Sequence, residues 1–220
     1  NNPTGKVFTE SELREISSLC IKWDVLAVTD EIYEHILYDG TTHISIASLP
    51  GMDERTITIN SISKTYSVTG WRIGWAIADS KITSRIRKIH DFLTVGAPTP
   101  FQYAATKALD FPAEYYTALQ KRYFDLRKML FDTLTDGGLN PYLPRGAYYI
   151  LADYSHFDKY ISSESDFDFS MRFLHKTGVA TVPGSSFYSS YKITKMVRFA
   201  FCKRTETLEK VRNNLLKMNK

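Results

Sequence analysis

The stretch Ser61–Trp75, SISKTYSVTGWRIGW, is the most informative part of the 220-residue sequence. Lys64 follows Ser61 at the spacing S-x-x-K, and Arg72 lies between two glycines, eight residues after the lysine. Glycines let a backbone approach a ligand closely, and an arginine can donate two hydrogen bonds to a phosphate. Burial and neighbouring cations lower the pKa of a lysine amine, which then attacks carbonyl carbons. The stretch therefore indicates a phosphorylated aldehyde cofactor held as a Schiff base.

The spacing S-x-x-K also occurs in enzymes that acylate the serine, and the sequence contains a later K-T-G at Lys176–Gly178. That chemistry requires Ser61 at the start of a helix and Lys176 on a strand. The apolar patterns instead place Ser61 at the end of a strand and the K-T-G at the end of a helix. An S-D-N triplet is also missing from the sequence. We therefore set the serine-nucleophile hypothesis aside.

Upstream of this stretch, the sequence predicts a helix followed by a buried strand. Thr9–Glu12 has the pattern of a capping box, and apolar residues follow at helical spacing as far as Trp23. Val25–Thr29 is almost entirely apolar, which is typical of a strand buried on both faces of a parallel sheet. Asp30 comes at the carboxyl end of this strand, where open α/β sheets bind their ligands. Two further strands are predicted over Arg55–Ser63 and Trp71–Ala78.

The rest of the chain predicts long helices and then a smaller mixed region. Ser80 is placed to cap a helix that runs to Leu93. Further helices are predicted over 100–109, 113–135, 166–177 and 205–218, and strands over 148–152 and 196–201. We expect an α/β protein in which residues 1–112 are the C-terminal part of a large domain with a mixed, mostly parallel sheet. Residues 113–136 are then a connecting helix and residues 137–220 a small α+β domain.

The composition is that of a globular protein, with 24% charged, 43% hydrophobic and 14% aromatic residues. The net charge of +4 is too small to indicate a nucleic acid or a membrane surface as partner. The two cysteines, Cys20 and Cys202, favour a reducing compartment, and we expect the cytoplasm. None of the histidines has the spacing of a zinc site, so no metal site is predicted.

Four motifs occur in a fixed order along the chain: N-P-T-G at Asn2–Gly5, D-x-x-Y at Asp30–Tyr33, S-x-x-K at Ser61–Lys64 and G-x-R-x-G-W at Gly70–Trp75. Together they resemble the pyridoxal-phosphate-dependent aminotransferases of class I/II, and the resemblance runs over all 220 residues. It implies the PLP-transferase fold of type I. The stretch Ile86–Thr94 also resembles the branch that contains kynurenine, glutamine and methionine aminotransferases.

The resemblance implies a role at the cofactor ring for four residues. Lys64 resembles the lysine that forms the Schiff base with pyridoxal 5'-phosphate and then moves the proton at the substrate Cα. Asp30 resembles the carboxylate that pairs with the pyridine nitrogen and makes the ring an electron sink. Tyr33 and Asn2 resemble the hydrogen-bond partners of the ring hydroxyl.

For three further residues, the resemblance implies contacts with the phosphate of the cofactor or the carboxylate of the substrate. Ser61 and Arg72 resemble ligands of the cofactor phosphate, which makes Ser61 a hydrogen-bond donor. Arg198, in VRFAF, resembles the arginine that binds the substrate α-carboxylate by two hydrogen bonds, and Asn2 lies with it at the substrate. Without the other motifs, a lone arginine in this apolar strand would simply face solvent.

The implied function is an aminotransferase that moves an amino group between an L-amino acid and a 2-oxo acid by a ping-pong mechanism. Two alternatives use the same residues: a carbon–sulfur lyase of the same fold, and an aminotransferase-like domain that senses a ligand without catalysis.

The chain resembles roughly the C-terminal half of whole family members, and it opens at Asn1 without a Met. We therefore expect it to be a piece of a protein that is a homodimer at full length, with no nucleic-acid or membrane partner. We expect these 220 residues alone to bind the cofactor poorly and to turn over little substrate.

Overall fold

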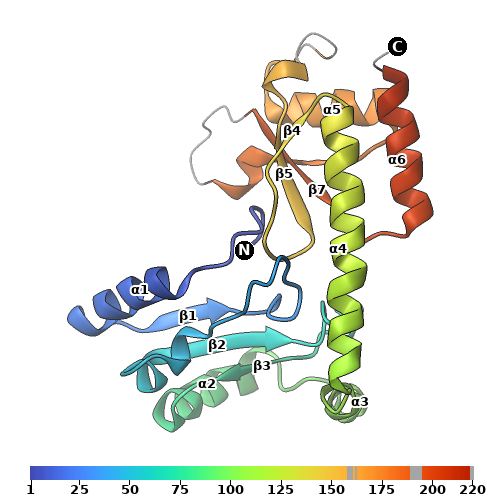
Figure 1. The fold of residues 1–220 in the computed structure, drawn as a ribbon. Coiled ribbons are helices and arrows are strands. Elements are labelled where there is room, and N and C mark those ends of the chain that lie inside the picture. The colour runs from blue at the N-terminus through green and yellow to red at the C-terminus, as the bar shows by residue number, and fades with distance from the viewer. Residues whose placement is uncertain (158–160, 162, 189–194, 219–220) are drawn as a thin grey trace. The chain divides into compact units, whose positions relative to one another are not determined.

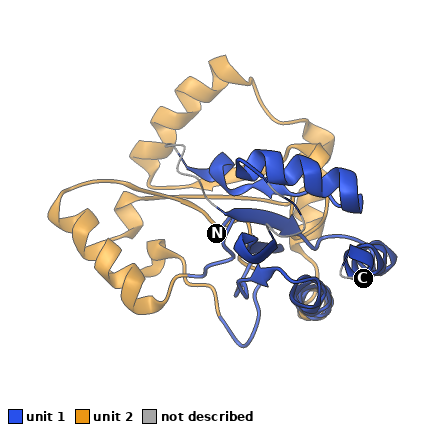
Figure 2. Ribbon diagram, turned by 90° about the horizontal axis from the view of Figure 1, so that it is seen from above, with its two compact units in different colours: residues 1–7, 36–41, 118–220 blue, residues 8–35, 42–117 orange. Residues whose placement is uncertain are grey.

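The structure is a computed structural model that describes residues 1–157, 161, 163–188 and 195–218. The chain divides into two compact units (Figure 2). Unit 1 comprises residues 1–7, 36–41 and 118–220, and unit 2 comprises residues 8–35 and 42–117. The predicted domains, 1–112, 113–136 and 137–220, stay a prediction. Among the described residues, no helix has the length and apolar composition that crossing a bilayer requires.

Unit 2 contains a three-stranded sheet in the order β1-β2-β3 (Figure 1). β1 (Ala27–Asp30) is parallel to β2 (Thr56–Ser61), and β3 (Gly74–Ile77) is antiparallel to β2. All three predicted strands are confirmed, each one shorter than predicted. A mixed sheet is also what the sequence predicted.

The helices of unit 2 are α1 (Glu10–Lys22), α2 (Ser80–Leu93) and α3 (Thr99–Leu109). The capping box of Thr9 and Glu12 is present at the start of α1. The expected cap of α2 was wrong by one residue: Asp79 caps the helix, because its carboxylate accepts the Lys81 N–H at 2.8 Å. Two apolar clusters form the core of this unit. They are Leu13, Cys20, Ile46, Leu49 and Met52, and Ile62, Ile73 and Ala105.

The expectation that the first strand is buried on both faces was wrong. Val28 in β1 is 64% exposed and Ile59 in β2, on the same face, is 42% exposed, whereas Ala27 and Thr29, which point to the other face, are half-buried. The described residues therefore cover one face of this sheet and leave apolar side chains of the other face in contact with solvent.

Unit 1 contains a four-stranded sheet in the order β4-β5-β7-β6, in which each neighbouring pair is antiparallel. The strands are β4 (Asn140–Pro141), β5 (Tyr149–Asp153), β6 (Val182–Pro183) and β7 (Met196–Ala200). The sequence predicted β5 and β7. It missed β4 and β6, because two residues are too few to show a period.

The helices of this half of the chain are α4 (Ala113–Asp136), α5 (Asp166–Thr177) and α6 (Thr205–Met218). All three were predicted, and only the end of α4 differs, by one residue. The first residues of α4, up to Thr117, belong to unit 2, and the rest of the helix belongs to unit 1.

Stacked aromatic rings form the core of unit 1. The rings of Tyr154 and Phe169 are parallel, with centroids 3.8 Å apart, and Phe173 stacks on Phe169 at 5.4 Å. Phe157 and Phe199 meet Phe173 edge-on. All five side chains are at most 3% exposed. Close-packed aromatic pairs of this kind make a rigid support for β5 and β7.

Candidate functional site

Five of the predicted site residues lie in unit 2, at or just beyond one edge of its sheet. Asp30 is the last residue of β1 and pairs in register with Ile59 of the parallel strand β2. Ser61 ends β2, so Asp30 and Ser61 reach the same carboxyl edge, where open α/β sheets bind ligands. Asp30 is exposed, and its Oδ1 accepts the Ile32 N–H at 3.2 Å. Tyr33 follows in the same turn and is half-buried.

Ser61 is placed by a close approach between β2 and β3. It pairs with Gly74, where an added Cβ would lie 2.8 Å from the Asn60 oxygen and 3.0 Å from the Ser61 Cβ. A glycine is therefore required opposite the serine. The Ser61 N–H donates to Asn60 Oδ1 at 2.7 Å, and Ser61 Oγ accepts the Ser63 N–H at 3.1 Å. The Ser61 hydroxyl proton remains available to a ligand.

Lys64 and Arg72 come from the segment that joins β2 to β3. Lys64 lies in the turn directly after β2 and is half-buried. Arg72 ends a short 3₁₀ helix, Thr69–Trp71, in the left-handed backbone region at a φ of 55°. Its side chain is exposed, and Nη1 donates to the Thr69 carbonyl at 2.9 Å. The spacing S-x-x-K…R thus places a hydroxyl, an amine and a guanidinium on one short segment beyond the sheet.

The other two predicted residues, Asn2 and Arg198, meet in unit 1. Arg198 lies on β7 and donates from Nη1 to Asn2 Oδ1 at 2.6 Å. Its guanidinium carbon lies 4.1 Å from the ring centre of Tyr149 and 5.0 Å from that of Phe187. Arg198 Nε is buried, and none of the described residues forms a hydrogen bond with it. A buried charged donor that lacks a partner is costly, which points to an anionic ligand at this position.

The turn Asn1–Gly5 places Asn2. Gly5 has a φ of +68°, and an added Cβ would collide with Pro144 and lie 2.8 Å from the Gly146 oxygen. The Gly5 carbonyl accepts the N–H groups of Arg145 and Gly146 at 3.0 and 2.9 Å. Asn, Pro and Gly are residues typical of turns. The docking of this turn on residues 144–146 carries Asn2 to the guanidinium of Arg198.

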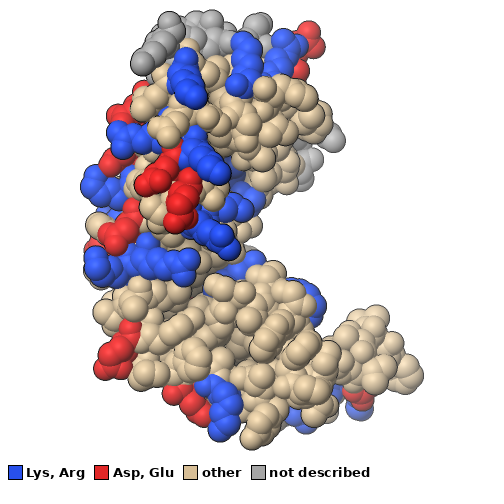
Figure 3. Space-filling model, turned by 90° about the vertical axis from the view of Figure 1, so that its right-hand side faces the viewer, with Lys and Arg blue, Asp and Glu red and all other residues tan. Residues whose placement is uncertain are grey.

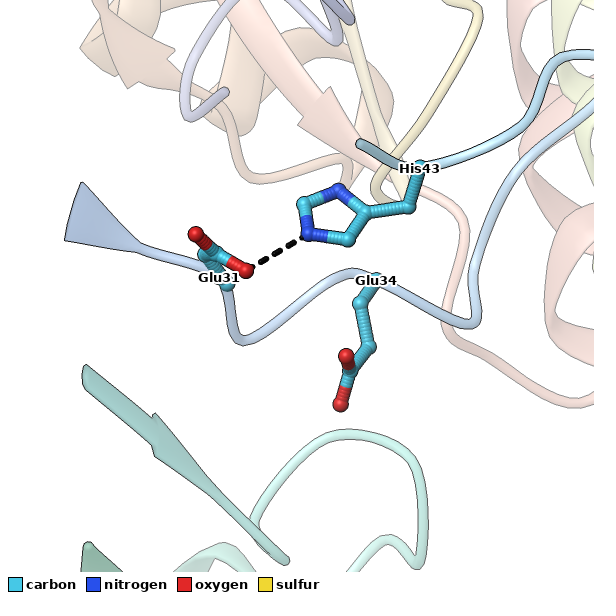
Figure 4. A group of neighbouring side chains, drawn as sticks. All are labelled: Glu31, Glu34 and His43. Carbon is cyan, nitrogen blue, oxygen red and sulfur yellow. Dashed lines mark hydrogen bonds and ion pairs between the residues drawn. The ribbon is translucent and has the colours of Figure 1, made fainter. Parts of the chain in front are cut away.

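Glu31, Glu34 and His43 form a cluster that the sequence analysis missed (Figure 4). Their ligand atoms lie within 4.8 Å of one another, as a metal site would require. Glu31 nevertheless accepts hydrogen bonds from His43 Nε2 at 2.7 Å, Ser45 Oγ at 2.8 Å and Thr29 Oγ1 at 3.0 Å. Glu34 accepts from Asn60 Nδ2 at 2.6 Å. Donors from the protein therefore satisfy the hydrogen-bonding needs of both carboxylates without a metal ion.

The environment of Glu31 determines its charge. Burial raises the pKa of Glu31, but the hydrogen bonds from His43, Ser45 and Thr29 more than offset burial, so the pKa is lowered. Glu31 is therefore ionised at neutral pH, directly after Asp30. The only signal in the sequence was the adjacent pair of acidic residues at the end of a strand.

The residues present fit pyridoxal phosphate. Unit 2 offers an amine for the aldehyde (Lys64), a carboxylate for the ring nitrogen (Asp30), and a hydroxyl and a guanidinium for the phosphate (Ser61 and Arg72). This donor set matches the chemistry of the cofactor group by group. The individual roles stay predictions, including the role of Tyr33 at the ring hydroxyl.

Comparison with known proteins identifies the family. The family model "Aminotransferase class I and II" matches residues 1–215. A kynurenine–oxoglutarate transaminase of Dictyostelium discoideum is 38% identical over 100% of this chain and 55% of its own length. Human kynurenine–oxoglutarate transaminase 1 is 35% identical over 99% of this chain and 56% of its own length. The chain thus spans about half the length of the curated relatives that it matches.

Solved structures agree in fold. N-succinyldiaminopimelate aminotransferase of Mycobacterium tuberculosis superposes with a TM-score of 0.93 at 33% identity, covering 99% of this chain and 56% of the other. An Escherichia coli protein with a methionine aminotransferase function gives a TM-score of 0.90 at 30% identity, with the same coverage. The chain therefore belongs to the class I and II aminotransferases, a family of pyridoxal-phosphate-dependent enzymes of fold type I.

Proposed function

We propose that this chain supplies the cofactor lysine and the substrate arginine of an aminotransferase, which moves an amino group between an L-amino acid and a 2-oxo acid by a ping-pong mechanism. The observation that carries the proposal is the parallel register of β1 and β2. It brings Asp30 and the Ser61–Lys64 segment to one edge of the sheet. A carboxylate and an amine at such an edge can hold the two ends of a pyridine aldehyde.

When bound, pyridoxal phosphate supplies an aldehyde carbon that condenses with amines and a ring that draws electron density from the substrate. Lys64 would hold the aldehyde and then move the proton at the substrate Cα through Nζ. Asp30 would keep the ring nitrogen protonated. Ser61 and Arg72 would bind the phosphate, and Tyr33 would donate to the ring hydroxyl.

Arg198 sets the substrate class in this proposal. Its Nε has no hydrogen-bond partner among residues 1–157, 161, 163–188 and 195–218, while Nη1 is already bound to Asn2. One edge of the guanidinium is therefore left for a carboxylate. Kynurenine and 2-oxoglutarate, which appear in the names of several relatives, both carry an α-carboxylate. We propose them as the first donor and acceptor to test.

We also propose that the active protein is a homodimer in the cytoplasm. Family members are generally dimeric, and unit 2 exposes large apolar side chains at Phe92, Leu93 and Val95. Both cysteines, Cys20 and Cys202, are free thiols, which suits a reducing compartment. Sedimentation at several protein concentrations tests the dimer directly.

The test of the activity is a product analysis on the protein expressed from its own gene, loaded with the cofactor. L-kynurenine or L-methionine is supplied with 2-oxoglutarate, and we expect glutamate only when the 2-oxo acid is present. Release of ammonia without a 2-oxo acid would instead identify a lyase. Ligand binding without any product would identify a sensing domain.

A pair of arginine variants makes the assay specific for the carboxylate. Arg198→Lys loses the paired donors, so kcat/KM should fall about 10- to 100-fold, the value of one charged hydrogen bond. Arg212→Lys is the matched control, because Arg212 pairs with Asp136 at the surface of the same unit, at 3.4 Å. Equal kcat/KM values for the two variants would contradict the role of Arg198.

A further inference from the structure

The turn that carries Lys64 is short and follows β2 directly. Within it, the Tyr66 N–H donates to the Ile62 carbonyl at 3.2 Å and the Ser67 N–H to the Lys64 carbonyl at 3.3 Å. A single turn of this length is unstable by itself, because it fixes several backbone angles for one or two hydrogen bonds. Other side chains must therefore hold the backbone from which Lys64 projects.

Two side-chain hydroxyl groups hold the carbonyls on either side of Lys64. The Ser63 carbonyl accepts from Thr69 Oγ1 at 3.0 Å, and the Thr65 carbonyl accepts from Tyr115 Oη at 2.8 Å. Ser63 and Thr65 are 4% and 3% exposed. Because water has little access to these residues, the hydroxyl groups supply partners that the carbonyls would otherwise lack.

The Tyr115 hydroxyl is itself held in place by neighbouring rings. Tyr115 lies in the first turn of α4, and its ring stacks on that of Tyr66 at 5.6 Å and 13°. Phe111 packs edge-on against Tyr115 at 4.8 Å, and the Tyr66 and Tyr116 hydroxyls are hydrogen-bonded at 2.7 Å. Burial and the hydrogen bond to Tyr116 raise the pKa of Tyr66, so the Tyr66 hydroxyl stays uncharged near neutral pH.

We propose that Thr69 and Tyr115 are positioning residues for Lys64. Their hydroxyl groups hold the peptide unit that precedes the lysine and the one that follows Thr65, and so set the direction in which the amine points. The inference rests on the proposed function, in which the Lys64 amine must meet an aldehyde. Loss of either hydroxyl leaves the lysine in place but lets its backbone rotate, which reduces the fraction of correctly aimed amine.

The experiment measures how fast Lys64 is labelled by pyridoxal phosphate and borohydride in the protein expressed from its own gene. Peptide mass mapping gives the Lys64 adduct relative to the adduct on Lys107, an exposed lysine of the same unit. Thr69→Val removes one hydroxyl and Thr69→Ser keeps it. Tyr115→Phe removes the other hydroxyl, and Tyr103→Phe is its control, because Tyr103 is 69% exposed.

We expect the Lys64 to Lys107 ratio to fall about tenfold in Thr69→Val and in Tyr115→Phe, the effect of one lost hydrogen bond. Thr69→Ser and Tyr103→Phe should keep the parent ratio. The pH at which labelling reaches half of its maximum should also shift in the two affected variants. A role in stability alone would lower the melting temperature without moving the ratio or this pH.

Each outcome decides between distinct ideas. Parent ratios in both Thr69→Val and Tyr115→Phe would overturn the inference while leaving the proposed function intact. A parent protein that does not label at Lys64 would overturn the proposed function and the inference with it. If Thr69→Val does not fold, Tyr115→Phe decides, since it keeps every ring contact and loses only the hydroxyl.

Discussion

Unit 1 and unit 2 differ in how far each covers its own apolar side chains. In unit 1 the rings of Tyr154, Phe169 and Phe173 stack in a core that is at most 2% exposed. In unit 2 the sheet leaves Val28 and Ile77 more than half exposed. Basic residues outnumber acidic ones in unit 1, and the reverse holds in unit 2. Figure 3 shows one face, on which charged side chains of both signs lie interspersed.

The difference separates two ways of placing functional side chains. Arg198 projects from a strand that is packed on a closed core, so packing places the group proposed to bind the carboxylate. Lys64 projects from a turn beside a sheet with one open face, so individual hydrogen bonds place the proposed cofactor lysine. Substitutions should therefore act through packing in unit 1 and through polar contacts in unit 2.

The largest effect should come from the core of unit 1. Phe173 is fully buried and contacts Phe157, Phe169 and Phe199, so Phe173→Ala should lower the free energy of unfolding by about 3 to 5 kcal/mol. Phe92 in unit 2 is 93% exposed, and Phe92→Ala should change this free energy by no more than about 0.5 kcal/mol. Urea denaturation measures both. Similar losses for the two variants would remove the contrast between the units.

A smaller effect is expected from the ion pair that the buried Arg127 forms with the exposed Asp39 in unit 1. Arg127 is 4% exposed and donates to both oxygens of Asp39, at 2.7 and 2.8 Å. Asp39→Asn should lower the free energy of unfolding by about 1.5 to 3 kcal/mol, the value of hydrogen bonds to a charged group. Arg212, paired with Asp136 at the surface, is the control, and Asp136→Asn should have almost no effect.

The same ion pair should make the free energy of unfolding depend on pH. The hydrogen bond from Arg127 holds the pKa of Asp39 below its ordinary value of 3.8. The stabilisation is therefore complete above that value and is lost as the pH falls through the lower pKa of the folded state. Below pH 4, the free energy of unfolding should decline less steeply in Asp39→Asn than in the parent protein. If the free energy of unfolding fell equally steeply with pH in both proteins, the result would contradict a stabilising role of the Asp39 charge.

In unit 2, weakening the polar cluster around Glu31 should lower the free energy of unfolding by about 1 kcal/mol. Glu31→Gln keeps the shape but weakens the hydrogen bonds from His43 and Ser45. The lowered pKa of Glu31 means that its stabilisation is present above pH 4.5 and disappears as the protein is acidified. Glu15→Gln, on an exposed part of α1, is the control. Hydrogen exchange of the 27–35 segment reports the change locally, and unchanged exchange in Glu31→Gln would contradict it.

The smallest effect on stability should come from the exposed apolar side chains of unit 2. Val95→Lys adds a charge to a residue that is 85% exposed, so stability should stay within about 0.5 kcal/mol of the parent. Binding of an apolar dye and self-association should both decrease, because exposed apolar patches promote association. A variant that binds as much dye as the parent would show that this region is covered in solution.

The sequence predicted the long elements well, because periodic apolar residues and end signals such as the capping box at Thr9 are local. It also assigned the seven candidate site residues, from short motifs whose order along the chain resembled a family. It missed β4 and β6, which are too short to have a period. It also missed the hydroxyls of Thr69 and Tyr115. Tyr115 meets the Lys64 turn only through the fold, since fifty residues separate it from Thr65.

The exposure of Val28 was missed for a different reason. An apolar run predicts that a strand is buried, but it does not say which chain segment covers it. The described residues cover one face only, and the chain spans about half the length of its relatives.

The central claim is that Lys64 is the cofactor lysine, and peptide mass mapping after reduction with borohydride tests it most directly. The protein expressed from its own gene is mixed with pyridoxal phosphate, reduced and digested. We predict one dominant adduct, on Lys64, that disappears in Lys64→Ala, while the exposed lysines of both units are labelled weakly. Adducts spread evenly over Lys81, Lys107 and Lys121, with none in excess on Lys64, would contradict the account.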